Sequence, residues 1–320
     1  MPELTPDVEL LVVWPQPELY VSRLTDEFPS VRVRGAVDWN SAPADLEGTQ
    51  ILVSHGRGLS DERLAQMPHL AWIQVLSSGT EHLAALRSGR PDLLMTSCSG
   101  IHGPQMAESA LLHMLALSRA MALVARERLD HVWAAPDVVT VLERKTVVIV
   151  GMGTTGVRLA RICSVLDMTV HAVSRSPRPI EGVERFFGRE QLVEAVSGAD
   201  YVVLAMPVED DTRELVGREL LEAMKPTAFL VNIARGAVVD EPALIEALRS
   251  GEIAGAGLDV FAVEPLPADS PLWGMDNVFI TPHIAGRSES YNERALEVVV
   301  VNLERYLAGA AGELRNVITS

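Results

Sequence analysis

Lys145-Thr-Val-Val-Ile-Val-Gly-Met-Gly-Thr-Thr-Gly156 is the stretch that decides the fold of this chain. Its apolar residues Val147 to Val150 predict a buried strand, and a G-x-G-x-x-G motif follows where a strand should turn into a helix. Gly151 suits the tight turn, Gly153 lets the backbone approach a pyrophosphate, and Gly156 lets the helix pack close to the strand. We therefore predict a dinucleotide-binding site here. A glycine-rich turn with a structural role only is the alternative.

Length, charge and cysteine content limit the class of protein. The 320 residues predict about two domains, and 48% of them are hydrophobic, which is enough for sizeable cores. The formal net charge of -16 argues against nucleic acid and anionic membranes as partners. The sequence shows neither a membrane-spanning apolar run nor a secretory signal, and Cys98 and Cys163 fit neither a disulfide framework nor a metal-ligand spacing. We expect a protein of the reducing cytoplasm that binds no metal.

Apolar strands alternate with helical segments in both parts of the chain, which predicts two α/β lobes with parallel sheets. The first lobe is expected to comprise residues 1–100 and 288–320 and to bind the substrate. Residues 101–287 are expected to form an inserted dinucleotide-binding lobe, with a cleft between the lobes as the ligand site. Strands are predicted at residues 8–14, 31–37, 50–54, 71–76, 93–97, 147–150, 169–173, 201–206, 229–233, 255–260 and 278–281.

The longest predicted helix runs from Gln105 to Leu129, a segment with almost no helix-breaking residues. Because this helix is apolar around much of its circumference, it belongs in a core or in an oligomer interface. A helix from Ser60 to Met67 would have Ser60 as its N-cap, and one over residues 241–250 would be closed by Gly251. Further helices are predicted at residues 17–28, 188–196, 215–224 and 288–307.

The residues after the second strand of the cofactor lobe, Val173-Ser-Arg-Ser176, indicate which dinucleotide binds. Folds that bind NAD usually place an acidic residue there, which hydrogen-bonds the adenine-ribose hydroxyls. This chain has Ser174 and Arg175 instead, with Arg178 close behind. An acidic residue would repel a 2′-phosphate, whereas serine and arginine would bind one, so we predict a preference for NADP(H), with NAD(H) also accepted. Merely solvated arginines with relaxed specificity are the alternative.

Polar residues of a chemically active kind follow three further strands, where parallel sheets place their active sites. The guanidinium of Arg235 can hold a carboxylate and a neighbouring keto oxygen through paired hydrogen bonds. Its alternative is a salt bridge to Asp240 or Glu241. Asp259 and Glu264 follow the next strand, and His283 follows the last one.

The pairing of His283 with Glu264 is the central chemical prediction. A carboxylate beside an imidazole favours the protonated ring and fixes its tautomer, which is what a general acid for carbonyl reduction needs. A surface histidine, or one satisfied within the core, is the alternative.

Together with the glycine-rich turn, these segments resemble the D-isomer-specific 2-hydroxyacid dehydrogenase family over nearly the whole chain. The matching parts are residues 150–156, 207, 232–244, 257–265 and 281–286. The resemblance implies a flavodoxin-like substrate lobe, a Rossmann cofactor lobe and a catalytic set of Arg235, Glu264 and His283. Hydride would pass from the nicotinamide to a 2-oxo acid that Arg235 orients and His283 protonates.

The resemblance also implies the contacts with the cofactor. Asp259 would face the nicotinamide carboxamide, and the backbone of Thr154 and Thr155 would bind phosphate, although these threonines depart from the family's commoner basic-plus-apolar pair. The expected cofactor-binding residues are Gly151, Gly153, Thr154, Thr155, Gly156, Ser174, Arg175, Arg178, Met206, Pro207, Thr212, Ile233, Ala234, Asp259, His283 and Gly286.

In the first lobe, Leu76-Ser-Ser-Gly-Thr-Glu-His-Leu83 resembles the family's substrate loop, with Glu81 where the family usually has Asp. Backbone N–H groups of Ser78 and Gly79 would then bind the substrate carboxylate, beside Arg235 and His283.

The resemblance favours an NADP-preferring glyoxylate or hydroxypyruvate reductase that forms a homodimer through the segment 105–129. Two alternatives stay open. One is an NAD-dependent enzyme like phosphoglycerate dehydrogenase. The other is a non-enzymatic, dinucleotide-sensing scaffold like the corepressors of this family, which keep the same catalytic residues.

Overall fold

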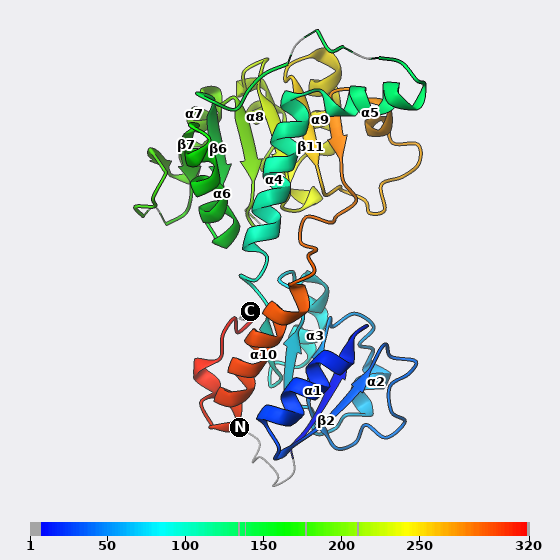
Figure 1. Ribbon diagram of the computed structural model, residues 1–320. Coiled ribbons are helices and arrows are strands. Elements are labelled where there is room, and N and C mark those ends of the chain that lie inside the picture. The colour runs from blue at the N-terminus through cyan, green and yellow to red at the C-terminus, as the bar shows by residue number, and fades with distance from the viewer. Residues whose placement is uncertain (1–7, 134, 138, 177, 210, 319–320) are drawn as a thin grey trace. The chain divides into compact units, whose positions relative to one another are not determined.

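The structure is a computed structural model that describes residues 8–133, 135–137, 139–176, 178–209 and 211–318. Its contacts divide the chain into unit 1, which is Met1–Ile101 with Ser288–Ser320, and unit 2, which is His102–Arg287. These boundaries lie within one residue of the predicted ones. Each unit is built on one sheet whose paired strands are parallel, so the predicted α/β fold with two doubly wound lobes is confirmed (Figure 1).

Unit 1 contains a five-stranded sheet in the order β2-β1-β3-β4-β5. This is the flavodoxin-like order that was predicted. The strands are β1 Val8–Val13, β2 Val31–Ala36, β3 Thr49–Ser54, β4 Trp72–Val75 and β5 Leu94–Ser97. The helices are α1 Pro17–Glu27, α2 Asp61–Ala65, α3 Ala84–Gly89 and α10 Tyr291–Leu307, with 3-10 turns at Glu81–Leu83 and Ala311–Glu313.

Segments from both ends of the sequence complete unit 1. Tyr20 of α1 and Leu303 of α10 belong to one buried cluster on the sheet, so α10 returns to the first lobe as predicted. After α10, Val317 forms an antiparallel bridge with Thr96 of β5. The C-terminal segment therefore pairs with β5, the edge strand of this sheet.

Unit 2 contains a seven-stranded sheet in the order β12-β11-β10-β9-β6-β7-β8. The chain adds strands on one side of β6 and then crosses to the other side at β9, and ligands of such sheets bind outside the carboxyl ends of the strands at this reversal. The strands are β6 Thr146–Val150, β7 Thr169–Val173, β8 Arg185–Phe187, β9 Tyr201–Leu204, β10 Phe229–Asn232, β11 Gly255–Leu258 and β12 Val278–Ile280.

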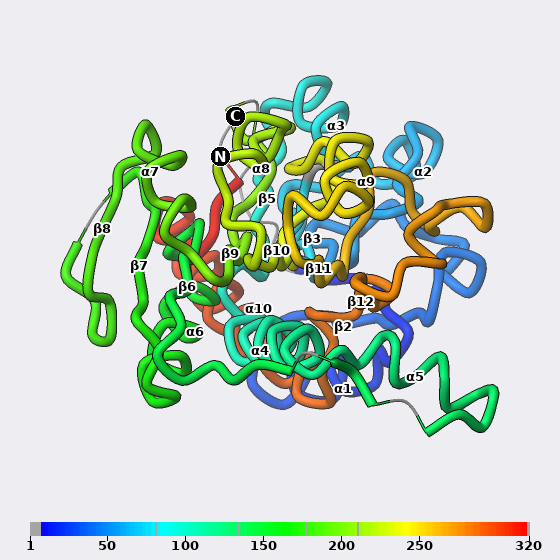
Figure 2. Tube along the Cα trace, turned by 90° about the horizontal axis from the view of Figure 1, so that it is seen from above, coloured from blue at the N-terminus to red at the C-terminus, as the bar shows by residue number. Residues whose placement is uncertain are grey.

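Helices cover both faces of this second sheet. Figure 2 shows α4 Gly103–Ser118 and α6 Thr154–Val165 on one side, and α8 Arg218–Ala223 and α9 Glu241–Ser250 on the other. The remaining elements are α5 Met121–Leu129, α7 Leu192–Ser197 and 3-10 turns at Arg189–Gln191, Gly236–Val238 and Pro271–Gly274.

The first helix and the last loop of unit 2 are joined directly. Gln105 on α4 donates from Nε2 to the carbonyl of Gly286 at 3.3 Å. A Cβ built on Gly286 would lie 3.0 Å from the ring of His102. The two places where the chain enters and leaves this unit are therefore neighbours.

The prediction of one helix from Gln105 to Leu129 is wrong. The segment forms α4 and α5, which are bent by 71° relative to each other. The carbonyl of Ser118 accepts the N–H of Thr140 at 2.8 Å, and Ala120 adopts a left-handed conformation with φ of 50°. The first helix therefore ends where the carbonyl of Ser118 bonds to Thr140, a residue far along the chain. The local sequence contains no helix breaker that would have indicated this end.

Within the described residues, no single helix is long and apolar enough to cross a membrane. The bent pair α4 and α5 reaches that length and composition only when its two helices are counted together.

Three other predicted helices start later than expected. The segment 188–196 begins with a 3-10 turn before α7, and the last helix begins at Tyr291. The segment 215–224 is helical only from Arg218, because Val216 forms a parallel bridge with Val239. The short elements β8 and α3 were not predicted.

Two predicted helix ends are confirmed. Ser60 caps α2 by accepting the N–H of Arg63 at 3.3 Å, and Gly251 closes α9 in a left-handed conformation with φ of 75°.

Candidate active site

The glycine-rich turn between β6 and α6 has the close backbone contacts that its motif predicts. Gly151 has φ of 103°, and a Cβ there would lie 2.7 Å from the carbonyl oxygen of Ala205. A Cβ on Gly156 would lie 2.0 Å from the carbonyl oxygen of Gly151, so no larger residue fits without movement of the backbone. Gly153 is the N-cap of α6, whose first-turn N–H groups favour an anion.

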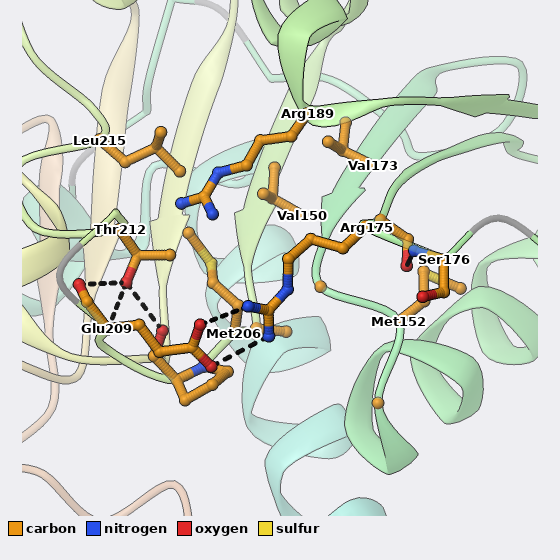
Figure 3. Close-up of a pocket in the computed structure, with 15 residues that line it drawn as sticks. Val150, Met152, Val173, Arg175, Ser176, Arg189, Met206, Glu209, Thr212 and Leu215 are labelled. Atoms are coloured by element: carbon orange, nitrogen blue, oxygen red, sulfur yellow. Dashed lines mark hydrogen bonds and ion pairs between the residues drawn. The ribbon is translucent and has the colours of Figure 1, made fainter. Parts of the chain in front are cut away.

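A pocket opens beside this turn, at the carboxyl ends of β6, β7 and β9 (Figure 3). It therefore lies at the point where the strand order reverses. Seven of the predicted cofactor residues line it: Gly151, Gly153, Ser174, Arg175, Met206, Pro207 and Thr212. The others do not line this pocket: Thr154, Thr155, Gly156, Arg178, Ile233, Ala234, Asp259, His283 and Gly286.

Of the residues that do not line the pocket, Arg178 stays beside the turn. Its Nη2 lies 3.5 Å from the carbonyl oxygen of Met152. Thr154, Thr155 and Gly156 form the first turn of α6, directly after the glycine-rich turn.

At the mouth of the pocket the sequence singled out Arg175, but not its charged neighbours Glu209, Arg189 and Asp211. The guanidinium of Arg175 pairs with the carboxylate of Glu209 through both of its terminal nitrogens, at 2.5 and 3.0 Å (Figure 3). Arg189, at the start of the 3-10 turn before α7, points into the same space and pairs with Asp211. Neither contact follows from sequence spacing, because each joins two segments that only the folded sheet brings together.

The predicted catalytic residues lie at the carboxyl ends of β10, β11 and β12, three neighbouring strands of the same sheet. His283 Nδ1 lies 2.6 Å from Glu264 Oε2, so the predicted pairing of these two residues is present. Glu264 is fixed in turn, because its Oε1 accepts the N–H of Phe261 at 3.0 Å. The contact with Glu264 leaves Nε2 as the ring nitrogen of His283 for an exchange of protons with a ligand.

Asp259 holds the loop that carries His283. Its Oδ1 accepts the hydroxyl of Thr281 at 2.6 Å and the N–H of Ile284 at 2.9 Å, and its Oδ2 accepts the N–H of Ala285 at 3.0 Å. Its backbone carbonyl accepts the N–H of His283 at 2.8 Å. Asp259 is only 1% exposed. These contacts anchor the loop, and the predicted contact of Asp259 with the nicotinamide carboxamide stays a prediction.

His113 on α4 supports this anchor from beneath. Its Nε2 lies 3.0 Å from Thr281 Oγ1, whose hydrogen is donated to Asp259, so the ring donates to the hydroxyl oxygen. Burial lowers the pKa of His113 to about 4, against the opposing effect of the Asp259 charge. The ring is therefore neutral at physiological pH, and among the described residues its Nδ1 has no hydrogen-bond partner.

Arg235 follows β10 in a turn that Asn232 stiffens. The side chain of Asn232 accepts the N–H of Ala234 and donates to the carbonyl of Arg235, both at 3.0 Å. The carboxylates proposed as alternative partners of Arg235 have other contacts: Asp240 caps α9, and Glu241 accepts the N–H of Ala262.

The predicted substrate loop of unit 1 follows β4. Ser78 donates its hydroxyl to the carbonyl of Cys98 at 3.3 Å, and the hydroxyl of Ser77 donates to the carbonyl of Gly79 at 2.7 Å. The hydroxyl of Tyr291 on α10 donates to the carbonyl of Leu76 at the start of this loop. The contact of Ser78 and Gly79 with a substrate stays a prediction.

Comparison with known proteins identifies the family. A family model for the NAD-binding domain of D-isomer-specific 2-hydroxyacid dehydrogenases matches residues 111–285. The chain belongs to the D-isomer-specific 2-hydroxyacid dehydrogenase family. It is accordingly an NAD(P)-dependent oxidoreductase. In the part of this dehydrogenase that the structure describes, His, Cys, Asp and Glu side chains form no cluster that could hold a metal ion.

Three similar proteins cover nearly all of this dehydrogenase. Glyoxylate/hydroxypyruvate reductase B of Pectobacterium carotovorum subsp. carotovorum is 32% identical over 300 residues, which are 91% of this chain and 88% of that protein. A crystal structure of a family member from Aeromonas salmonicida subsp. salmonicida has a TM-score of 0.86 at 31% identity and covers 98% of this chain and 99% of its own. Another, from Xanthobacter autotrophicus Py2 in complex with NADPH and MES, has a TM-score of 0.82 at 32% identity and covers 98% of both chains.

The anchoring role of Asp259 can be tested by its amide. We expect Asp259→Asn to lower the free energy of unfolding by about 2 kcal/mol, because an NH2 group must then face a buried backbone N–H group or the Thr281 hydroxyl. Denaturant unfolding measures this change. Asp276→Asn is the matched control, since Asp276 pairs with Arg126 at the exposed surface and should change stability by less than about 1 kcal/mol. Equal effects of the two substitutions would contradict the anchor.

Proposed function

We propose that this dehydrogenase is an NADPH-preferring reductase that converts a small 2-oxo acid, glyoxylate or hydroxypyruvate, to the corresponding 2-hydroxy acid. The observation that carries the proposal is the contact of His283 Nδ1 with Glu264 Oε2 at 2.6 Å. The likeness to a glyoxylate/hydroxypyruvate reductase supports the substrate class. The NADPH complex of a 32% identical structure, and the absence of an acidic residue at Ser174, support the cofactor.

Unit 2 has the features that a dinucleotide requires. The pocket at β6, β7 and β9 and the paired residues at β11 and β12 lie along one carboxyl edge of one sheet. Gly151, Gly153, Ser174, Arg175 and Thr212 would hold the adenosine and phosphate groups in that pocket. A reduced nicotinamide, when bound, supplies the hydride that reduces the carbonyl carbon.

The residues of the chain would supply the proton and the orientation. His283, protonated, donates one N–H to Glu264 and delivers the other proton, from Nε2, to the carbonyl oxygen. Glu264 balances the charge of the imidazolium and holds its ring, since Phe261 N–H fixes the carboxylate. The guanidinium of Arg235 would orient the substrate carboxylate through paired hydrogen bonds, and the backbone of Ser78 and Gly79 would bind the same group.

We also propose that the protein is a cytoplasmic homodimer. Cys98 and Cys163 are buried free thiols, as expected in a reducing compartment. Cell fractionation tests the cytoplasmic location. The segment from α4 onward exposes several large apolar side chains, and Trp133 is 97% exposed. These residues are Leu112, Leu115, Met121, Leu129, Val132 and Trp133.

Sedimentation equilibrium tests the dimer. We expect the mass of two chains, because exposed apolar patches of this kind mark protein interfaces. Trp133→Ser with Leu129→Ser should shift the equilibrium toward single chains, whereas the surface control Val165→Ser, at an 82% exposed site on α6, should not. A wild-type protein that sediments as one chain would refute the dimer.

The reductase activity is tested by the loss of reduced nicotinamide absorbance with glyoxylate, hydroxypyruvate and pyruvate. We expect turnover, with higher kcat/KM for NADPH than for NADH, because Ser174 and Arg175 replace the acidic residue that would repel a 2′-phosphate. Higher efficiency with NADH would contradict the cofactor assignment. Preferred oxidation of 3-phosphoglycerate with NAD would favour the phosphoglycerate dehydrogenase alternative, and no turnover with any of these acids would favour the scaffold.

The proton donor is tested by His283→Asn. We expect kcat to fall roughly 10²- to 10⁴-fold, as for removal of a general acid, while NADPH still binds. His69→Asn is the control, because His69 is exposed in unit 1 and has no part in the proposed chemistry. Near-normal turnover of the His283 variant would remove this residue from its proposed role.

A further inference from the structure

We propose that Glu209 sets the strength of cofactor discrimination, because its carboxylate competes with the 2′-phosphate of NADP(H) for the guanidinium of Arg175. The proposal deepens the proposed use of NADPH and rests on it. It identifies Glu209 as a specificity-determining residue that no motif in the sequence indicates.

The geometry of the contact carries the argument. Glu209 engages both terminal nitrogens of Arg175, at 2.5 Å and 3.0 Å, in a two-pronged pair. A phosphate binds arginine through the same pair of parallel N–H groups. The carboxylate and a phosphate therefore cannot occupy this edge of the guanidinium together, and one must displace the other. Figure 3 shows the two side chains pointing toward one another. Arg175 comes from the segment after β7 and Glu209 from the loop after β9.

The backbone beneath Glu209 is fixed, whereas its side chain is not. The hydroxyl of Thr212, a residue only 5% exposed, accepts the N–H of Glu209 at 2.5 Å and lies 3.1 Å from the carbonyl oxygen of Pro207. The side chains of Arg175 and Glu209 are 63% and 38% exposed. An exposed ion pair of this kind is weak, so a ligand can separate it while the loop stays in place.

The balance of charge at the mouth makes the competition matter. Arg175 and Arg189 are each paired with a carboxylate of the same loop, Glu209 and Asp211, so two positive charges face two negative ones. A phosphate that takes Arg175 from Glu209 leaves the carboxylate unpaired beside a second anion, and like charges at close range repel. NADH carries no 2′-phosphate, so it leaves the ion pair intact. Glu209 therefore opposes NADPH and spares NADH.

Equilibrium binding without substrate tests the proposal. For Glu209→Gln, which keeps the size of the side chain and removes its charge, we expect the Kd for NADPH to fall roughly three- to fivefold. The Kd for NADH should stay within about twofold. Titration calorimetry, repeated with adenosine 2′,5′-bisphosphate and adenosine 5′-monophosphate, assigns the change to the 2′-phosphate. Glu246→Gln is the matched control, since Glu246 on α9 forms a comparably exposed ion pair with Arg218 on α8 and the substitution removes the same charge.

A double-mutant cycle shows whether the effect acts through Arg175. Arg175→Gln should weaken NADPH binding, and Glu209→Gln should then tighten it much less than in the wild-type background, because only the repulsion between carboxylate and phosphate is left to remove. An unchanged or weakened affinity for NADPH in Glu209→Gln would overturn the proposal. So would an equal gain in the Arg175→Gln background, which would show general repulsion in place of competition. Because these measurements need no turnover, a protein that binds NADPH but reduces no 2-oxo acid would refute the proposed reductase and leave this inference standing.

Discussion

The buried carboxylate of Asp259 is the constraint on which the candidate site depends. The carboxylate accepts two backbone N–H groups and a hydroxyl from the loop after β12. The backbone carbonyl of Asp259 accepts the N–H of His283. That loop holds His283 with φ of 51°, a conformation that non-glycine residues adopt only when their surroundings require it. The carboxylate of Asp259, with its three hydrogen-bond donors from the loop, holds the backbone in this conformation. Glu264 then needs to fix only the rotation of the His283 ring.

The parallel sheet of unit 2 places two kinds of chemistry on one edge. At the carboxyl ends of β6, β7 and β9 the residues include glycines of the turn, Ser174 and Arg175, which suit an anionic nucleotide. At the ends of β10, β11 and β12 the residues can exchange protons or orient a carboxylate. Because all these strands run in the same direction, their carboxyl ends lie along the same edge of the sheet. The loops that follow the strands then decide which function each end has.

The sequence predicted the parts of this arrangement that depend on local signals. The motif from Gly151 to Gly156, and polar residues directly after apolar strands, predicted both halves of the candidate site. Contacts between distant segments were out of reach. The break after Ser118 results from the N–H of Thr140, and the pairing of Arg175 with Glu209 exists only once β7 and β9 flank β6. The anchoring contacts of Asp259 were not predicted either, because its spacing does not reveal that three donors surround its carboxylate.

The junction between α4 and the loop after β12 has a consequence for the architecture of the chain. Gln105 bonds to Gly286, and His113 bonds to Thr281, so the two ends of the inserted unit are fastened to each other by its own side chains. A domain whose two ends lie close together can be inserted into another chain with little disturbance of its host. Unit 2 is thus a self-contained module that evolution or a protein engineer could excise or transplant, and it would take with it the nucleotide pocket and the histidine–glutamate pair.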